Sequence, residues 1–257
     1  MPRFFIPGNV RLGRVATIEG RDANHITRVL RMGPGETIDI VDSSGKEYSA
    51  LIKSGSEDRI ILDVVSEGRE MCREPSVFIT ILQGLPKSDK MDIVVRRNTE
   101  IGVSRFVPVI TERSVSRPEK AAQAKRVSRW RRIAEEASKQ SGRQRIPDVL
   151  DVVGFDDALL LATREVARCV GEGLECLILF PWELETSQGI KGILRESPGV
   201  REIMCFVGPE GGFSHNEAEK AVRHGARTCS LGPRILRTET CALVLSSIIL
   251  YETGEMG

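Results

Sequence analysis

The first 70 residues alternate between hydrophobic and polar positions in short runs, which is the pattern of half-buried β-strands. Turn-forming residues separate the runs, for example at residues 42–45 (DSSG). Between them, Ile26, Val29 and Leu30 recur at helical spacing and predict a helix over residues 22–31, followed by a turn at 33–35 (GPG). We therefore expect a small β-rich module with strands at residues 37–41, 48–53 and 59–65.

A polar and charged segment, residues 67–75, follows this module, and we place a domain boundary between residues 72 and 73. Beyond it, strand-like apolar runs alternate with helical patterns, which is typical of an α/β sheet. Ser214 and Glu217 form a capping box at one helix start. We expect strands at residues 77–82, 106–110, 148–152, 176–180, 203–207 and 228–231, and helices at 89–101, 121–140, 155–167, from 214, and at 240–251.

Two of these strands end in a glycine–proline loop that leads into a helix. The loops are residues 208–212 (GPEGG) and the segment that begins with Gly232 and Pro233. Ligands bind outside the carboxyl ends of strands in open α/β sheets, and Gly208, Gly211 and Gly212 can adopt positive φ angles and let a ligand approach the main chain. The pair predicts one pocket built largely from backbone, although either loop alone also resembles an ordinary tight connection.

The distribution of charged residues indicates an anion-binding surface only in parts of the chain. The 257 residues carry a formal net charge of +1, with 40% hydrophobic and 28% charged residues, so a whole-chain basic signature for nucleic-acid binding is absent. Between residues 125 and 145, however, there are eight lysines and arginines and only two acidic residues, Glu135 and Glu136. A solvated helix face is the alternative, but the one-signed excess favours an anion-binding surface. Arginines suitable for phosphate contacts also gather in the β-rich module.

Cysteine and histidine positions argue against a disulfide framework and a metal site. No two cysteines form a C-x-x-C pair, and His25, His215 and His224 have no ligand spacing, so we expect reduced thiols and no bound metal. The longest apolar stretch, residues 241–250, is too short to span a bilayer. These features predict a cytoplasmic protein with no membrane partner. The cysteines are Cys72, Cys169, Cys176, Cys205, Cys229 and Cys241.

Common nucleotide and hydrolase motifs are missing from the sequence. No G-x-G-x-x-G follows a predicted strand, and neither a P-loop nor a G-x-S-x-G elbow is present. Residues alone therefore indicate a backbone-rich pocket flanked by arginines, a nucleotide-like ligand and an anionic partner.

Several sequence blocks, taken together, resemble one family. LGPRILRTETCAL (231–243) is the most specific, and VGPEGGFS (207–214), LPKSDKMDIVVRRNTEIGV (85–103), TERS (111–114), AEEASKQSGRQRIP (134–147) and HITRVLRMGPG (25–35) accompany it. The combination is similar to the bacterial 16S ribosomal RNA uridine-N3 methyltransferases of the SPOUT class, which use S-adenosylmethionine. The match covers nearly the whole chain in order; Asn98 stands where the family pattern has alanine.

The resemblance implies an α/β fold in two domains. An N-terminal PUA-like β-barrel, residues 1–72, is expected to grip RNA. A C-terminal SPOUT methyltransferase domain, residues 73–257, is expected to end in a trefoil knot and to form a homodimer, which suits the all-round apolar last helix. The implied partner is 16S ribosomal RNA or the small ribosomal subunit, with uridine 1498 of the decoding region as the family target.

The resemblance also assigns residues to roles. S-adenosylmethionine, without a metal, is expected among the loops after Phe180, Val207 and Leu231. Arg237 is expected to stabilise negative charge on the uracil oxygens, and Glu239 to accept the N3 proton or orient Arg237. The expected cofactor contacts are Phe180, Pro181, Gly208, Pro209, Glu210, Gly211, Leu231, Gly232, Ile235, Leu236, Thr238, Thr240 and Ala242. The expected RNA contacts are Arg3, His25, Arg28, Arg31, Arg113, Arg129, Arg132 and Arg143.

Three alternatives remain open at the level of sequence. Arg237 and Glu239 can form a structural salt bridge that pins the helix start. The enzyme can be a SPOUT ribose 2′-O or transfer-RNA methyltransferase; the N-terminal module and the HITRVLR segment favour the ribosomal family. The chain can also be a non-catalytic RNA-binding protein, against which the intact block at residues 231–240 argues.

Overall fold

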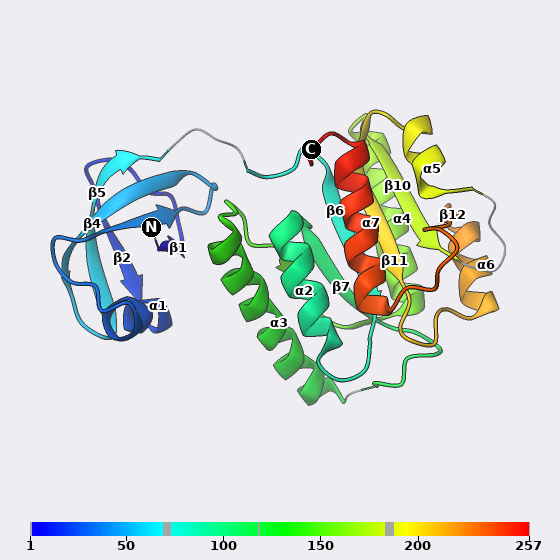
Figure 1. Cartoon of the computed structure of the whole chain (residues 1–257), viewed down its shortest axis with the longest axis horizontal. Coiled ribbons are helices and arrows are strands. Elements are labelled where there is room, and N and C mark those ends of the chain that lie inside the picture. The colour runs from blue at the N-terminus through cyan, green and yellow to red at the C-terminus, as the bar shows by residue number, and fades with distance from the viewer. Residues whose placement is uncertain (1, 69–72, 118, 183–187, 257) are drawn as a thin grey trace. The chain divides into compact units, whose positions relative to one another are not determined.

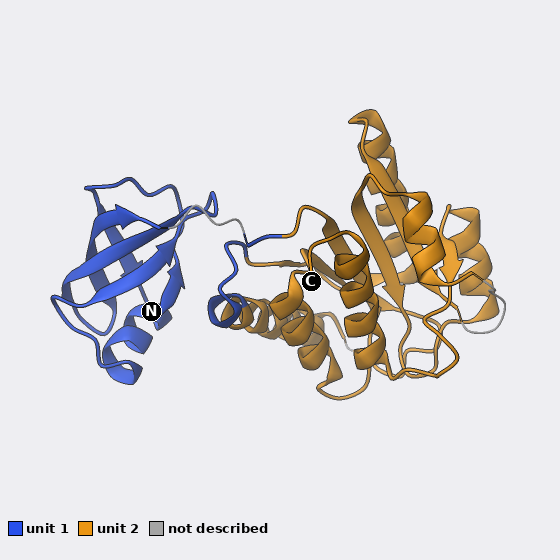
Figure 2. Cartoon of the chain, turned by 45° about the horizontal axis from the view of Figure 1, so that its top comes forward, with its two compact units in different colours: residues 1–74, 138–145 blue, residues 75–137, 146–257 orange. Residues whose placement is uncertain are grey.

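The computed structural model describes residues 2–68, 73–117, 119–182 and 188–256, and the chain divides into two compact units (Figure 2). Unit 1 comprises Met1–Glu74 with Ser138–Arg145, and unit 2 comprises Pro75–Ala137 with Ile146–Gly257. Residues 138–145, expected in the C-terminal domain, thus group with the N-terminal unit. The boundary predicted at residue 72 falls at 69–72, outside the described residues, and stays a prediction.

Unit 1 is built on a five-stranded sheet with the strand order β1-β3-β4-β5-β2. Only the β1–β3 pair is parallel, and no pairing joins the end strands β1 and β2 within the described residues, so the sheet forms a half-barrel. The β-rich module predicted from the sequence is confirmed. Its strands are β1 (Arg3–Phe5), β2 (Val15–Glu19), β3 (Thr37–Val41), β4 (Glu47–Gly55) and β5 (Arg59–Glu67).

Alternation of side chains explains the core of unit 1. Ile38 and Ile40 on β3, Ala50 on β4 and Leu62 on β5 are fully buried, and the residues between them are more exposed, as expected for one covered sheet face. The helix predicted over residues 22–31 is shorter and changes type: α1 (Arg21–Asn24) continues into a π-helical turn, η1 (His25–Val29), which buries Ile26.

Unit 2 contains a seven-stranded sheet in which every pair is parallel, with the order β12-β10-β11-β6-β7-β8 and β9 paired to β7 (Figure 1). The predicted α/β class is therefore confirmed. Central strands that are buried on both faces have continuous apolar sequences, so they could be predicted from the sequence. The strands are β6 (Phe78–Gly84), β7 (Arg105–Ile110), β8 (Asp148–Val149), β9 (Val153–Gly154), β10 (Glu175–Pro181), β11 (Val200–Val207) and β12 (Arg227–Cys229).

Helices cover both faces of this sheet with separate cores. One core joins the sheet to α2, α3, α5 and α7, and α2 lies beside α7 (Figure 1); the other joins it to α4 and α6. The predicted capping box at α6 is present, with Ser214 accepting from the Glu217 N–H and Glu217 from the Ser214 N–H. The helices are α2 (Lys90–Ile101), α3 (Lys120–Ser141), α4 (Phe155–Gly171), α5 (Ile190–Glu196), α6 (His215–Arg223) and α7 (Thr238–Glu252).

The last helix, α7, is apolar on nearly all sides, as its sequence indicated. Leu245 and Ile249 are fully buried against the sheet and its neighbouring helices, whereas Leu243 and Val244 are only half-buried and Tyr251 is 66% exposed. In the described part of the chain, no helix combines the length and hydrophobicity needed to cross a membrane. The trefoil knot stays a prediction.

Candidate active site

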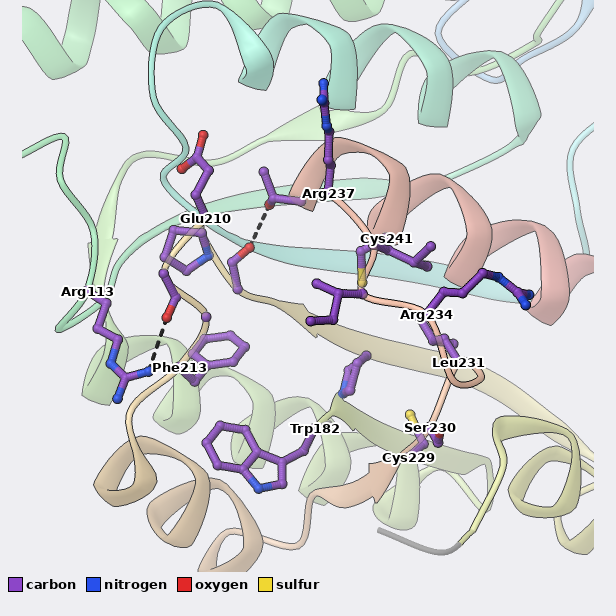
Figure 3. Close-up of a pocket in the computed structure, with 18 of the residues that line it drawn as sticks. Arg113, Trp182, Glu210, Phe213, Cys229, Ser230, Leu231, Arg234, Arg237 and Cys241 are labelled. Carbon is purple, nitrogen blue, oxygen red and sulfur yellow. Dashed lines mark hydrogen bonds between the residues drawn. The ribbon is translucent and has the colours of Figure 1, made fainter. Parts of the chain in front are cut away.

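The two glycine–proline loops meet around one cavity of about 480 Å³ in unit 2, at the carboxyl ends of β10, β11 and β12 (Figure 3). Cavities of roughly 300–1,000 Å³ commonly hold small molecules. The GPEGG loop forms one wall, and residues 229–238, which connect β12 to α7, form another. The pocket expected from the paired loops is therefore present where the parallel sheet predicts it.

Hydrogen bonds tie the GPEGG loop to the start of α7. The hydroxyl of Thr238 donates to the Gly208 carbonyl at 2.6 Å, and the buried amide of Gln83 donates to Thr238 at 2.8 Å. A Cβ on Gly84, at the end of β6, would lie 2.5 Å from the Pro209 ring, so this position requires glycine. The loop is consequently held between β6 and α7 by close packing.

The glycines of the two loops differ from the expectation. Gly212 (φ 66°) and Gly232 (φ 107°) adopt positive φ angles, but Gly208 and Gly211 do not, so that part of the sequence interpretation was wrong. At Gly211 the constraint is packing instead: an added Cβ would lie 3.1 Å from the Cβ of Arg113, whose guanidinium donates to the Gly211 carbonyl at 3.1 Å.

Aromatic side chains form the apolar wall of the cavity. Trp182 and Phe213 line it (Figure 3). Phe180 is fully buried, and its ring centroid lies 4.4 Å from that of Phe213. The main-chain N–H of Trp182 donates to the Cys229 carbonyl at 3.0 Å, which fixes the chain after β10 beside β12. Glu183, the last residue of the loop expected after Phe180, lies outside the described residues.

A charged cluster occupies the side of the cavity next to α2. The Lys90 ammonium lies 2.9 Å from the Glu210 carboxylate and 3.6 Å from that of Glu239. The hydrogen bond to Glu210 raises the pKa of Lys90. Burial alone would raise the pKa of Glu210, but hydrogen bonds from Lys90 and from the Lys87 N–H outweigh it and lower that pKa.

The two candidate catalytic residues lie on the first turn of α7. Arg237 is the exposed N-cap residue, and Glu239 follows inside the helix. The salt bridge between them, left open as an alternative by the sequence, is not found among the described residues, because the Glu239 carboxylate is turned toward Lys90. No ion pair is described for Arg234 or Arg237 either, which leaves both guanidinium groups available at the mouth of the cavity.

Most of the residues expected to contact a cofactor line the cavity, and three do not. Phe180 and Ala242 are fully buried in the two cores of unit 2, and Thr240 lies on α7 outside the lining. Contact of these three residues with a cofactor stays a prediction. The lining residues that were expected are Pro181, Gly208, Pro209, Glu210, Gly211, Leu231, Gly232, Ile235, Leu236 and Thr238.

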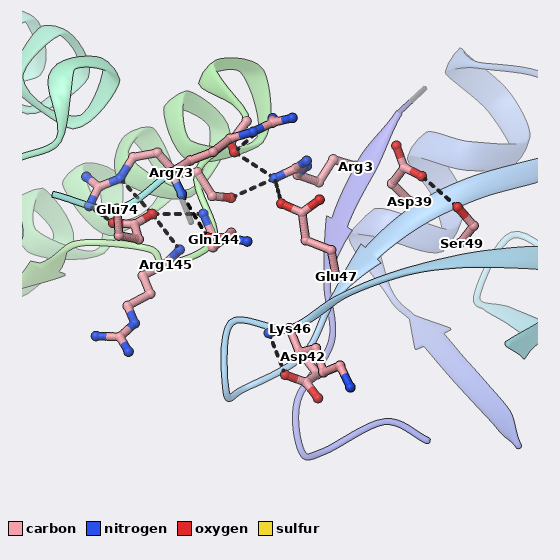
Figure 4. A network of polar contacts seen from close by, with 12 residues as sticks. Arg3, Asp39, Asp42, Lys46, Glu47, Ser49, Arg73, Glu74, Gln144 and Arg145 are labelled. Atoms are coloured by element: carbon pink, nitrogen blue, oxygen red, sulfur yellow. Dashed lines mark hydrogen bonds and ion pairs between the residues drawn. The ribbon is translucent and has the colours of Figure 1, made fainter. Parts of the chain in front are cut away.

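Two of the expected RNA contacts, Arg3 (Figure 4) and Arg143, bond to other residues of unit 1. The Arg3 side chain is 8% exposed and donates to Glu47 and to the carbonyls of Gly142 and Arg143. Arg143 is 5% exposed at its side chain and bonds to Glu74. Both guanidinium groups are buried and bonded within unit 1, which argues against their assignment to RNA.

The other expected RNA contacts are exposed. His25, Arg31, Arg113 and Arg132 present their side chains to solvent. Arg28, on η1, is ion-paired with Glu57. On α3, Arg129 bonds to Asp92.

Sequence reasoning missed several lining residues. Lys90 lies within residues 85–103 (LPKSDKMDIVVRRNTEIGV), but no pattern in the neighbouring sequence indicates that its side chain reaches Glu210, 120 positions later. Trp182, Phe213 and Arg234 lie shortly after the ends of three different strands, β10, β11 and β12, and this position is the signal that was available. Cys229 also lines the cavity; burial raises the pKa of its thiol to about 12, so it remains protonated.

One cluster outside the cavity has metal-ligand geometry. Ligand atoms of Cys169, Cys176 and Glu202 lie within 4.8 Å of one another, because Cys176 and Glu202 are neighbours on β10 and β11. Burial raises the pKa of both thiols, and the Arg168 guanidinium already bonds to Glu202. Protonated thiols beside a cation are a poor fit for a metal ion. None of the five described cysteines is part of a disulfide, and Cys72 lies outside the described residues.

Comparison with known proteins assigns the chain to a family. A family described as an RNA methyltransferase domain matches residues 73–250, and one described as an RNA methyltransferase PUA domain matches residues 18–65. The chain is also 32% identical, over 98% of its length and 97% of the relative, to the ribosomal RNA small subunit methyltransferase E of Bacillus subtilis. This chain belongs to that RNA methyltransferase family.

Solved structures of similar proteins support the assignment. The ribosomal RNA small subunit methyltransferase E of Neisseria gonorrhoeae, bound to S-adenosylmethionine, has a TM-score of 0.83 and 29% identity, with 98% of this chain and 97% of that chain covered. A putative methyltransferase of Legionella pneumophila, also with bound S-adenosylmethionine, has a TM-score of 0.79 and 27% identity, with 97% and 96% covered. In both relatives the similarity extends through both units of the fold.

Proposed function

We propose that this protein transfers a methyl group from S-adenosylmethionine to N3 of a uridine in 16S ribosomal RNA. The single observation that carries the proposal is the cavity between the GPEGG loop and the loop before α7, with Arg234 and Arg237 unpaired in the described structure at its mouth. Relatives similar over nearly the whole chain carry the name ribosomal RNA small subunit methyltransferase E, and one of them binds S-adenosylmethionine.

The cavity suits S-adenosylmethionine in its chemistry. Trp182, Phe213 and Leu231 offer apolar surface to an adenine ring, and the turns at Gly212 and Gly232 expose main-chain groups for the polar edges of the cofactor. When bound, this cofactor supplies a methyl group on a positively charged sulfur.

The remaining chemistry falls to residues at the start of α7. Uridine N3 is a poor nucleophile until it loses its proton. Glu239 accepts that proton, and the electrons of the N3–H bond remain on the uracil ring. Arg237 stabilises the negative charge that develops on the uracil oxygens and orients the base. Bound S-adenosylmethionine would supply the methyl group to N3, and the electron pair of the broken carbon–sulfur bond would remain on sulfur. Since N3 lies on the pairing edge, the uridine must be unpaired and turned out of its helix.

RNA is held by exposed basic residues in each unit. His25, Arg28 and Arg31 belong to unit 1, and Arg129 and Arg132 lie on α3 in unit 2. Arg113 stands at the cavity itself. We place the activity in the cytoplasm, on the small ribosomal subunit or its RNA, with the chain working as a homodimer through α7.

A calorimetric titration tests the cofactor assignment directly. We expect S-adenosylmethionine to bind the purified protein, and to bind equally well after treatment with a chelator. Gly211→Val should abolish this binding without unfolding the protein, because the added side chain collides with Arg113 and displaces the loop. Gly171→Val is the matched control, since nothing lies within 4 Å of a Cβ at that position. No binding at millimolar cofactor would sink the proposal.

A further inference from the structure

Gln83 is a polar residue that is buried completely in unit 2, in contact with a residue that lines the cavity. It is the last residue but one of β6, its exposed fraction is 0%, and it does not itself line the cavity. Buried polar side chains are usually hydrogen-bonded, and their partners show what they hold in place. The partners of the Gln83 amide therefore indicate its role.

The amide nitrogen of Gln83 lies among acceptors from three segments of the chain. It donates to the Gly84 carbonyl at 3.0 Å, at the end of β6, and to the Thr238 hydroxyl at 2.8 Å, at the start of α7. The carbonyls of Val207 and Gly208, where β11 meets the GPEGG loop, lie 3.4 and 3.5 Å from the same nitrogen. An atom surrounded by these acceptors must be the amide NH₂ group, because an oxygen there would have no donor to bond to.

The Thr238 hydroxyl extends this contact to the GPEGG loop. Since the hydroxyl oxygen accepts from Gln83, its single hydrogen is left for the Gly208 carbonyl, to which it donates at 2.6 Å. Thr238 is the first residue of α7, is 5% exposed and lines the cavity. Two hydrogen bonds in series thus connect β6, the start of α7 and the loop that forms one cavity wall.

The same helix start carries Arg237. Arg237 is the N-cap residue of α7, and its carbonyl accepts from the N–H groups of Thr240 and Cys241 at 2.9 and 2.8 Å. Its side chain makes no capping hydrogen bond, although such a bond often stabilises the first turn of a helix. The side chain of Thr238 instead ties this turn to Gly208. The place of Arg237 relative to the GPEGG loop therefore depends on the Thr238 hydroxyl.

The arrangement carries a cost that stability alone does not explain. The Oε1 atom of Gln83 is buried and has no hydrogen-bond partner in the described part of the chain. An unsatisfied buried acceptor lowers the stability of a fold, whereas an apolar side chain of similar size carries no such penalty. Residues that break a rule of stable packing are commonly found at functional sites.

We propose that Gln83 is a positioning residue for methyl transfer, which acts through the Thr238 hydroxyl to set the place of Arg237 relative to the GPEGG loop. This inference rests on the proposed function, in which Arg237 stabilises charge on the uracil oxygens. A charge-stabilising donor works only at the right distance from the developing charge, and a displacement of about 1 Å can lower a rate by about a hundredfold. Gln83 itself transfers no proton.

The direct test measures hydrogen exchange at the first turn of α7 in the free protein. The N–H groups of Thr240 and Cys241 report on this turn, because both donate to the Arg237 carbonyl. Gln83→Met removes the amide donor, and Thr238→Val removes the hydroxyl at nearly constant volume. Each should speed the exchange of these two N–H groups by about tenfold relative to those in the middle of the helix. Thr238→Ser, which keeps the hydroxyl, should stay near the wild type.

Unchanged exchange in Gln83→Met would overturn the proposal, and this readout needs neither cofactor nor activity. A second test measures methyl transfer in a single turnover with saturating cofactor and RNA. Gln83→Met and Thr238→Val should each slow it by about tenfold or more. The calorimetric affinity of Gln83→Met for S-adenosylmethionine should change less than about threefold, a factor of three being under 1 kcal/mol.

A double variant shows whether the two residues act together. If Gln83 acts through the Thr238 hydroxyl, the variant with both substitutions should be no slower than the slower of the two single variants. Rate losses that multiply in the double variant would show that the two residues act independently, which contradicts the proposal.

Ser246→Ala is the matched control. Ser246 is also fully buried, on α7, and the substitution removes one side-chain hydrogen bond, to the Ala242 carbonyl, at a site that does not line the cavity. It should leave the rate and the exchange at the first turn unchanged. If Ser246→Ala reproduces the loss of rate, or if Gln83→Met loses cofactor affinity in parallel with rate, Gln83 has no positioning role. If the wild type transfers no methyl group while the exchange still responds to Gln83→Met, the proposed function fails and the link between Gln83 and α7 stands.

Discussion

Arg237 is the residue whose surroundings best fit a catalytic role. Its guanidinium is exposed beside the cavity, and no ion pair is described for it, although Glu239 lies two positions away. Figure 3 shows Arg237 and Glu210 pointing to the same side of the pocket, with Arg234 on another side. An arginine that is not neutralised by its own protein can meet negative charge on a bound substrate.

Replacing Arg237 should therefore affect chemistry more than binding. We expect Arg237→Ala to slow methyl transfer by the equivalent of about 2.7–4 kcal/mol, the usual loss when a charge-stabilising donor is removed. Its affinity for RNA should stay near that of the wild type, as measured by filter binding. Arg237→Lys, which keeps a positive charge, should lose less activity. A parallel loss of RNA affinity in Arg237→Ala would show that the residue serves binding.

At the scale of elements, α6 links the pocket to the rest of unit 2. Glu217 is almost fully buried and accepts from the N–H groups of Ser214 and of Glu112, the latter from the loop after β7 at 2.8 Å. The capping box thus fastens two strand-end loops as well as starting a helix. Its presence was predictable, because the S-x-x-E pattern is local, but the contact with Glu112 was not.

Loss of the cap should lower the stability of the fold by a measurable amount. Ser214→Ala should reduce the free energy of unfolding by about 0.5–2 kcal/mol, since the Glu217 N–H loses its acceptor. Urea denaturation measures this change. Ser214→Thr retains a hydroxyl and should be close to wild type. Equal midpoints for Ser214→Ala and wild type would show that the cap contributes nothing to stability.

Elements differed in how well their sequence predicted them, for physical reasons. Helices α2, α3 and α4 are long enough for an apolar stripe, and their predicted ends lie within a few residues of the observed ones. The strands β1 and β2 and the helix α5 are short and were missed. Pairing between distant loops, such as Lys90 with Glu210, depends on the strand order β11-β6, which no local pattern specifies.

At the scale of the whole molecule, α7 keeps apolar side chains that the single chain does not fully bury. Leu243, Val244 and Ile248 are partly exposed along it, and Tyr251 is largely exposed. A contiguous apolar strip of this kind commonly marks a protein interface.

Light scattering at micromolar concentration should give the mass of a dimer. Tyr251→Asp should shift the protein toward monomer without unfolding it, because this side chain is 66% exposed in the single chain. Val222→Asp is the control, since Val222 is similarly exposed but lies on α6. A monomeric mass for the wild type would contradict the homodimer.

Substitutions in unit 1 should weaken the affinity for RNA without changing the affinity for the cofactor. The double variant Arg28→Ala, Arg31→Ala should weaken RNA binding and reduce the slope of its salt dependence by about 0.7–0.9 per lost phosphate contact. Both residues lie in unit 1, whereas the cavity lies in unit 2, so the affinity for S-adenosylmethionine should not change. An unaltered salt slope would exclude these arginines from the RNA contact.

The central claim is the identity of the methylated atom, and one measurement addresses it. Small ribosomal subunits that lack the modification are incubated with the protein and isotopically labelled S-adenosylmethionine, and the nucleosides of the 16S RNA are then resolved by mass spectrometry. We predict label in 3-methyluridine, and its near absence with Arg237→Ala. Label in a 2′-O-methylated nucleoside, or in transfer RNA in place of 16S RNA, would contradict the account.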